Sequence, residues 1–225
     1  MSPSDAIHEP THGRVQEMAA CPQCASPVET PLGCPSCGTL FHLEKDPDPF
    51  EAIGLAARFR VDPEDLRRRM LRFSRMTHPD FFATAGPEVK ERAERASAIL
   101  NAAHAVVMDD AARADWLIGS LDGPDENEER AMPKEFLLEV LEWNELLEEA
   151  RSIAAVSQER LASLRSDLER RRDGALASVA SFLDPLPARG SPALREARRE
   201  LNVVRYVDRT LGELEALRLS RAAAR

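Results

Sequence analysis

Apolar side chains recur with the period of an α-helix over most of the chain from residue 50 onward. The segment 63–77 follows an N-cap residue, Asp62, and opens on Pro63, and both residues favour the start of a helix. Its apolar positions recur at spacings of four, three and four, and the segment after Gly86 repeats that pattern. The two stripes predict an antiparallel helical hairpin. They consist of Leu66, Met70, Phe73 and Thr77, and of Val89, Ala93, Ala96, Leu100, Ala103 and Val107.

Helices are also predicted on both sides of this hairpin. A short helix covers residues 50–55, and another at 111–121 would contribute to the same core. After a break rich in Asp, Glu, Gly and Pro, three longer helices are predicted at 133–150, 157–183 and 191–221, with antiparallel neighbours. The fold class is all-α, because strand-like alternation is absent outside residues 21–40. The predicted organisation is a disordered tail at 1–20, a small cysteine module at 21–40, a helical domain at 48–121, a linker at 122–132 and a C-terminal three-helix bundle at 133–225.

Composition and charge exclude several classes of protein. The chain has 225 residues, 43% of them hydrophobic and 31% charged, and no apolar run reaches the roughly 20 residues that span a bilayer. The first twenty residues include Asp5, Glu9 and Glu17 and lack the apolar core of a secretory signal. We therefore expect a cytoplasmic protein with no membrane partner. The net charge of -9 repels polyanions at long range, so nucleic acid is not an expected partner.

The four cysteines form two closely spaced pairs. Cys21-Pro-Gln-Cys24 is followed, after nine residues, by Cys34-Pro-Ser-Cys37-Gly38, which is the spacing of a four-thiolate zinc site. Gly38 permits the positive φ that such a turn can require. Four protein thiolates complete a tetrahedron, so the expected zinc is structural rather than catalytic. A redox dithiol, iron in place of zinc, and chance spacing are the alternatives.

The predicted helix at 63–77 has one basic face. At about 100° per residue, Arg68, Arg72 and Arg75 fall in one sector almost opposite the apolar stripe. On an isolated helix, such a face is by default a solvated surface. The tripeptide His78-Pro79-Asp80 follows directly, and its place between a basic amphipathic helix and an Ala-rich antiparallel helix makes it specific.

This arrangement resembles the J domain over about residues 48–121. In that family a His-Pro-Asp loop and a basic second helix dock on a DnaK-class chaperone and stimulate its ATP hydrolysis. The resemblance implies that His78, Pro79 and Asp80 contact the chaperone, and that the arginines face an acidic chaperone surface. Phe81 is a departure, because a Lys commonly follows the motif.

A second surface is predicted in the acidic stretch 122–149, which holds 11 acidic and 2 basic residues. Its helix has a core stripe, and a second apolar patch lies about 100° to 200° around the helical wheel. The helix is either sandwiched between two others or exposes this patch for binding; carboxylates at the patch border are unusual beside a buried face. The stripe is Phe136, Val140, Trp143 and Leu147; the patch is Leu137, Leu138 and Leu141, bordered by Glu142, Glu145 and Glu149.

The chain from Cys21 onward is similar to the HscB family, the J-protein co-chaperones of iron-sulfur cluster biogenesis. The residues that carry the likeness are Asp48-Pro-Phe-Glu-Ala-Ile-Gly-Leu, Arg113-Ala-Asp-Trp-Leu and Phe136-Leu-Leu-Glu-Val-Leu-Glu. The resemblance implies a C-terminal domain that binds the scaffold protein IscU and a J domain that stimulates an HscA or DnaK-class chaperone. A four-cysteine module precedes the J domain in part of that family. By the same resemblance, the scaffold contacts are Leu137, Leu138, Leu141, Glu142, Glu145, Arg205 and Tyr206.

The first hypothesis is therefore an adaptor that carries no catalysis of its own. A general protein-folding J-protein is the nearest alternative, and binding of IscU discriminates between the two. A zinc-ribbon regulator that binds nucleic acid through the basic helix is a further alternative. The chain's acidity and the lack of aromatic residues among the arginines disfavour it. A zinc hydrolase is set aside, because the cysteine site has no open metal position.

Overall fold

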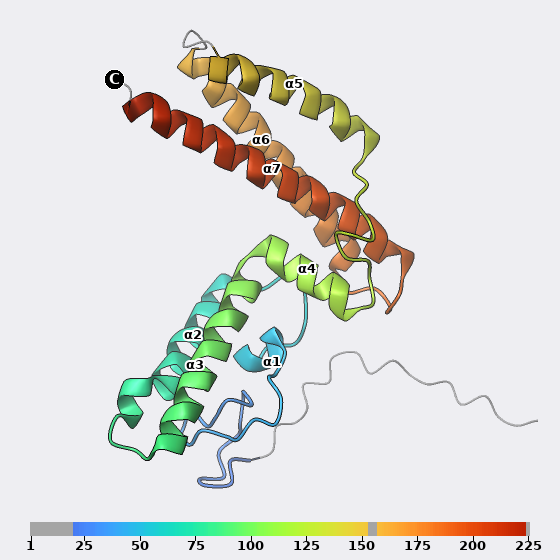
Figure 1. Cartoon of the computed structure of the whole chain (residues 1–225). Coiled ribbons are helices and arrows are strands. Elements are labelled where there is room, and N and C mark those ends of the chain that lie inside the picture. Colours follow the sequence, from blue (N-terminus) through green and yellow to red (C-terminus); the bar gives the residue numbers. More distant parts are fainter. Residues whose placement is uncertain (1–19, 153–156, 224–225) are drawn as a thin grey trace, which may run out of the picture. The chain divides into compact units, whose positions relative to one another are not determined.

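A computed structural model describes residues 20–152 and 157–223 and confirms an all-α protein (Figure 1). Among these residues there is no β-strand, and residues 20–40 form turns joined by isolated bridges. The predicted tail at 1–20 lies outside the described residues except for Ala20. None of the described helices is long and apolar enough to cross a membrane. The helices are α1 (Pro49–Ile53), α2 (Pro63–Thr77), α3 (Pro87–Met108), α4 (Asp110–Ser120), α5 (Lys134–Ser152), α6 (Gln158–Leu183) and α7 (Pro192–Ala223).

The helix boundaries agree with the capping signals in the sequence. The Asp62 side chain accepts the Glu64 backbone N–H, and Pro63 occupies the first position of α2. Ser157 caps α6 in the same way. One element was missed: Pro79–Phe82 forms a 3-10 turn, η1, in the loop between α2 and α3. Its Pro79 lies at the first helical position, where a missing N–H costs nothing.

The described residues form two compact units. Unit 1 contains the described residues up to Ala57 together with Val61–Met108, and unit 2 contains Arg58–Arg60 together with the described residues from Asp109 onward. This division groups α4 with the C-terminal helices, because α4 packs on α6 and α7. The sequence grouped that segment with the helical domain at 48–121. The predicted limits of the functional domains, 48–121 and 133–225, stay a prediction, because this division reflects only which residues pack together.

The core of unit 1 is built by the predicted hairpin. Helices α1 and α2 both pack on α3. Burial of the α2 stripe is nearly complete at Leu66 and Phe73, whereas Met70 is only half-buried. The α3 stripe is buried from Ala93 to Val107. This burial fixes which face of α2 remains in solvent.

Unit 2 is organised around the hairpin of α6 and α7 (Figure 1). Phe136 anchors α5 on this hairpin. The Phe136 ring is fully buried and meets Trp143 and Tyr206 edge to face, with centroids 5.7 and 5.6 Å apart. The guanidinium of Arg171 on α6 lies 5.1 Å from the same ring centroid. Aromatic and cation–π contacts of this kind hold one stripe of α5 inward.

The predicted linker at 122–132 runs along α7 and is hydrogen-bonded to it. The Arg198 Nε donates to the Pro124 carbonyl at 2.9 Å, and Asn202 Nδ2 donates to the carbonyls of Glu129 and Ala131. The buried Glu129 carboxylate accepts the Ala131 N–H at 3.0 Å and pairs with Arg195 and Arg199 on α7. These contacts fix the point at which α5 begins.

Glu129→Gln should flatten the pH dependence of stability. The hydrogen bond from the Ala131 N–H, supported by Arg199, lowers the pKa of the Glu129 carboxyl below its ordinary value. The folded pKa therefore lies below the unfolded one, so the ionised form contributes stability above the unfolded pKa of about 4.3. This stability is lost as pH falls through the folded pKa.

Urea unfolding at a series of pH values from neutral down to about pH 3 measures this effect. We expect the wild type to lose more stability over the acidic range than Glu129→Gln, which has no carboxyl to protonate there. Glu91→Gln, at an exposed position on α3, is the matched control and should follow the wild type. Parallel curves for wild type and Glu129→Gln would contradict the assignment.

Candidate metal centre and partner-binding faces

The cysteine module contains the same backbone turn twice. In the first turn the Cys21 N–H donates to the Ser26 carbonyl, and in the second the Cys34 N–H donates to the Thr39 carbonyl, both at 2.8 Å. The fifth residue of each turn returns a hydrogen bond to the first cysteine and has a positive φ, 57° at Ala25 and 77° at Gly38. Each turn therefore presents two thiols on one side.

The two turns bring all four sulfurs together. The Sγ atoms of Cys21 and Cys37 are 3.7 Å apart, those of Cys24 and Cys34 are 3.6 Å apart, and all four lie within 4.8 Å of one another. Sulfurs about 2.3 Å from a tetrahedral metal lie roughly 3.8 Å from each other, so the observed spacing fits a four-thiolate metal site. These four residues are positioned to hold a metal ion, and they would fill the shell of a four-coordinate one.

The surroundings of the thiols shift their pKa values in different directions, and a lowered pKa favours the thiolate that binds a metal. A hydrogen bond with Thr39 lowers the pKa of the Cys37 thiol to about 6, and burial raises the pKa of Cys21 to about 11. Thiolates are the metal ligands, so the hydroxyl of Thr39 favours the ligating form of Cys37. Ser26 occupies the equivalent position in the first turn and lowers the pKa of Cys24.

The module is packed against the helices of unit 1. The buried Thr30 hydroxyl donates to the Ala52 carbonyl on α1 at 2.7 Å. Gly54, with a φ of 71°, meets the module so closely that a Cβ there would lie 2.2 Å from the Glu29 carbonyl oxygen. The Glu29 carboxylate forms ion pairs with Arg72 and, at 3.8 Å, with Arg69 on α2. Glu29 was not predicted, because nothing local in the sequence signals a partner 43 residues away.

The basic face of α2 lies where the helical wheel predicted it. Arg68, Arg72 and Arg75 are all exposed, and the stripe of Leu66 and Phe73 is buried. Arg68 forms an ion pair with Asp65 at 3.1 Å, and Arg72 pairs with Glu29. Neighbouring carboxylates therefore hold part of this face in place while leaving it open to solvent.

The His78-Pro79-Asp80 loop presents a carboxylate to solvent. His78 ends α2, and its Nδ1 accepts the Asp80 backbone N–H at 3.3 Å. The Asp80 side chain is 89% exposed. The exposed Phe81 ring meets His78 edge to face, with a centroid separation of 6.1 Å. The backbone fixes the loop, and its charged atoms remain available to a partner.

The second apolar patch on α5 is exposed. Leu137, Leu138 and Leu141 are 46%, 68% and 60% exposed, and the bordering Glu142 and Glu145 are also in solvent. Phe136, Trp143 and Leu147 are buried, so α5 has one covered face and one open face. A helix sandwiched between two others would bury both apolar faces, and the exposure of the three leucines contradicts that alternative.

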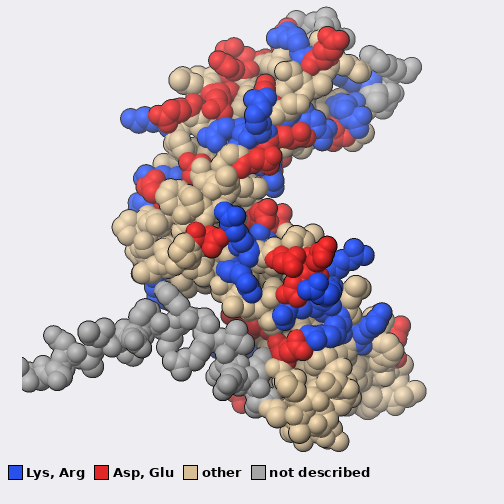
Figure 2. Space-filling model, turned by 180° about the vertical axis from the view of Figure 1, so that it is seen from behind, with Lys and Arg blue, Asp and Glu red and all other residues tan. Residues whose placement is uncertain are grey.

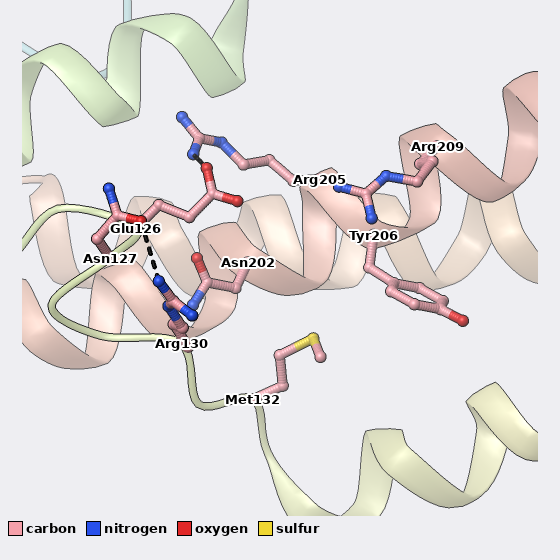
Figure 3. A pocket seen from close by; sticks show the side chains of 8 residues that line it. All are labelled: Glu126, Asn127, Arg130, Met132, Asn202, Arg205, Tyr206 and Arg209. Atoms are coloured by element: carbon pink, nitrogen blue, oxygen red, sulfur yellow. Dashed lines mark hydrogen bonds and ion pairs between the residues drawn. The ribbon is translucent and has the colours of Figure 1, made fainter.

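Arg205 and Tyr206 are neighbours on α7 and line one pocket, but their side chains point apart: Arg205 toward Glu126 and Tyr206 away from it (Figure 3). Arg205 pairs with Glu126 and, at 3.0 Å, with Asp115. The Tyr206 hydroxyl is 3.2 Å from Asn144 Nδ2 on α5. Asn144 and Leu137 lie within about 20° of each other on the helical wheel. Tyr206 therefore borders the leucine patch on its Leu137 side, whereas Arg205 is held in the adjoining pocket.

Charges of both signs are interspersed on the face shown in Figure 2. Lys and Arg side chains alternate there with Asp and Glu, and no extended field of one sign appears. Binding to nucleic acid depends on neutralising many phosphates, which requires a continuous basic surface. This face does not offer one.

Comparisons with known proteins agree with the family resemblance. A family model described as the HSCB C-terminal oligomerisation domain matches residues 132–215. A co-chaperone protein HscB homolog from Bordetella petrii is 36% identical over 133 residues, which cover 59% of this chain and 78% of that protein. The human iron-sulfur cluster co-chaperone protein HscB is 32% identical over 56% of this chain and 54% of its own.

The solved structures support the same fold. The crystal structure of human co-chaperone protein HscB has a TM-score of 0.70 at 24% identity, covering 87% of this chain and 96% of that chain. Chaperone HscB from Vibrio cholerae has a TM-score of 0.63 at 22% identity, covering 77% and 98%.

Exchanging the residues at the two positive-φ positions should move metal retention in opposite directions. A left-handed conformation costs a residue with a Cβ roughly 1–2 kcal/mol, and glycine's extra flexibility offsets part of that cost. Ala25→Gly should therefore stabilise the first turn by about 0.5–1 kcal/mol. Gly38→Ala should destabilise the second by a similar amount, although no atom lies near the added Cβ.

Competition with a chelator on the metal-loaded protein measures both effects, because metal binding and folding of a small module are coupled. We expect Ala25→Gly to retain metal at higher chelator concentration than the wild type, and Gly38→Ala to release it earlier. Shifts of the same sign in both variants would show that the two turns are not equivalent.

Proposed function

The chain belongs to the HscB family of co-chaperones, and from that membership we propose that it delivers an IscU-type iron-sulfur scaffold protein to an HscA or DnaK-class chaperone. The observation that carries this proposal is the pair of open faces on otherwise packed helices. One is the basic face of α2 with the Asp80 loop, and the other is the leucine patch of α5. An exposed apolar patch on a packed helix is typical of a binding surface. The basic face is assigned the same role because the exposed Asp80 loop follows it directly.

In the proposed mechanism, unit 1 docks on the chaperone. Arg68, Arg72 and Arg75 attract an acidic surface and orient the encounter, since charges of opposite sign raise the rate of association. The exposed Asp80 carboxylate then enters a cationic network on the chaperone, where charge-assisted hydrogen bonds are strong. ATP is hydrolysed on the chaperone, and this chain supplies only contacts.

Unit 2 holds the scaffold protein. Leu137, Leu138 and Leu141 offer an apolar helix face to a groove, in the manner of an amphipathic helix docking on its partner. Glu142 and Glu145 select a basic rim on the scaffold. Tyr206 extends the surface from α7 on the Leu137 side. Arg205 adds a cation from the adjoining pocket, where it pairs with Glu126 and Asp115.

The four cysteines would hold zinc. Tetrahedral thiolate coordination suits zinc, which would close the two turns and replace the hydrophobic core that so small a module lacks. With all four positions taken by protein sulfurs, water would have no access to a bound metal. The role of this site in the proposal is structural.

Replacement of Asp80 by Asn should abolish stimulation of the chaperone. The substitution keeps the shape of an exposed side chain and removes its charge, which costs about 1.5–3 kcal/mol of charge-assisted hydrogen bonding. We expect single-turnover ATP hydrolysis, stimulated by the wild type in the presence of scaffold, to fall at least about tenfold. Asp173→Asn, at an exposed position on α6, should leave stimulation intact.

The other outcomes of this assay are informative. Stimulation that depends on Asp80 but not on the scaffold protein would indicate a general protein-folding J-protein. Absence of stimulation by the wild type, with the organism's own HscA or DnaK-class chaperones, would refute the proposed docking.

Leu141→Arg should remove binding of the scaffold protein. A buried charge at the centre of an apolar contact behaves as the loss of a hot spot, about 2 kcal/mol or more, which corresponds to at least about 30-fold in Kd. Titration calorimetry with a purified IscU-type scaffold measures it. Leu219→Arg is the matched control, because Leu219 on α7 is 56% exposed against 60% for Leu141. Equal affinity of the two variants would show that the patch does not bind the scaffold.

A further inference from the structure

A groove runs between the second cysteine turn and α2. Pro35 and Gly38 of the module line one side, and Arg68, Leu71 and Arg75 of α2 line the other together with Arg72. The cysteine module therefore does not stand apart from the basic face of α2. It supplies a wall beside the arginines that are proposed to meet the chaperone.

The groove combines an apolar side chain with cationic neighbours. Leu71 is 55% exposed, and Arg68 and Arg75 lie three residues before it and four after it, which places all three on one side of the helix. Pro35 adds apolar surface from the module. This chemistry fits a segment that carries an aliphatic side chain between carboxylates.

The module wall is fixed relative to α2 by contacts already described. The Thr30 hydroxyl donates to the Ala52 carbonyl, the Glu29 backbone meets Gly54, and the Glu29 carboxylate pairs with Arg72. Gly33 lies against the Met76 side chain: a Cβ added at Gly33 would lie 3.1 Å from the Met76 sulfur. The groove is preformed, which reduces the entropy lost on binding.

We propose that the second cysteine turn (residues 34–39) and α2 form one docking groove for an acidic, aliphatic segment of the chaperone. The inference rests on the proposed function, and it assigns the four-cysteine module a direct part in chaperone recognition. Charge complementarity selects the occupant, since three arginines border the groove. A nucleic acid strand would gain less, because Leu71 and Pro35 offer apolar surface and no hydrogen bond from a side chain.

The internal repeat of the module provides a matched pair of variants. Pro35 and Pro22 occupy the same position in the two Cys-Pro-x-Cys turns, but only Pro35 lines the groove. Pro35→Glu places a carboxylate where the acidic segment would bind, and Pro22→Glu makes the same change on the outside. Metal content per chain and circular dichroism test whether both variants keep the metal and the fold.

The measurement is the Kd of the full-length protein for the purified chaperone, by fluorescence anisotropy, at low and moderate salt. We expect Pro35→Glu to weaken binding about tenfold and Pro22→Glu to stay within twofold of the wild type. Leu71→Ser should weaken binding independently of salt. Asp80-dependent stimulation by the wild type, measured in parallel, tests the proposed function separately.

Each contrary outcome has a distinct meaning. Equal Kd values for Pro35→Glu and Pro22→Glu, with wild-type stimulation intact, would overturn the groove and leave the proposed function standing. Equal weakening by both, accompanied by loss of metal, would reduce the module to a structural part and also overturn the groove. A change in self-association by light scattering, with chaperone affinity unchanged, would assign the groove to a second copy of this chain. No binding by the wild type would refute the proposed function itself.

Discussion

Burial of a single apolar stripe on α2 and on α5 determines which side chains these helices leave for partners. Leu66 and Phe73 are drawn into the core of unit 1, and the arginines opposite them must then face solvent. Phe136 and Trp143 play the same part in unit 2 and turn the leucine patch outward. On α5 the consequence is unusual, because the exposed side is itself apolar. The cost of leaving three leucines in water would be offset if this patch binds a partner, as proposed.

Polar contacts over long sequence distances position these faces. Arg198 and Asn202 of α7 donate hydrogen bonds to backbone carbonyls of the segment 122–132. These bonds fix the point at which α5 begins, and therefore which face of α5 is directed toward α7. In unit 1, Thr30 and Glu29 hold the cysteine module against α1 and α2. Both sets of contacts satisfy backbone or charged groups that would be costly to bury unpaired. Through these contacts, the segment 122–132 is held beside α7 and the cysteine module is held beside α2.

The extent of prediction from sequence follows from the range of the interactions involved. Helix limits were predictable because caps and periodicity are local, as Asp62 with Pro63 shows. The metal site was predictable for the same reason, since the spacing within each turn sets where its two thiols point. The pairing of Glu29 with Arg72 was not, because no residue between them signals it. The packing of α4 on α7 was not predicted either. The apolar pattern of α4 shows that one face is buried, but it does not show which helix covers that face. Ala25 and Gly38 each follow a Cys-Pro-x-Cys sequence, so the repeat makes them equivalent. The positive φ of Ala25 was nevertheless not predicted, because alanine rarely adopts that conformation.

The separation of the two faces into different compact units has a consequence for how such an adaptor can act. The α2 face belongs to unit 1 and the α5 face to unit 2, so neither partner needs to alter the other's contacts on this chain. In the proposed function, tethering alone would make the second encounter intramolecular and raise the effective concentration of scaffold beside the chaperone, to the millimolar range for short connections. Two modest affinities then suffice for efficient delivery, and each partner can still leave when its own contact is broken. Separate surfaces on two units suit the proposed delivery better than one tight interface, because a chain that delivers a scaffold must also release it.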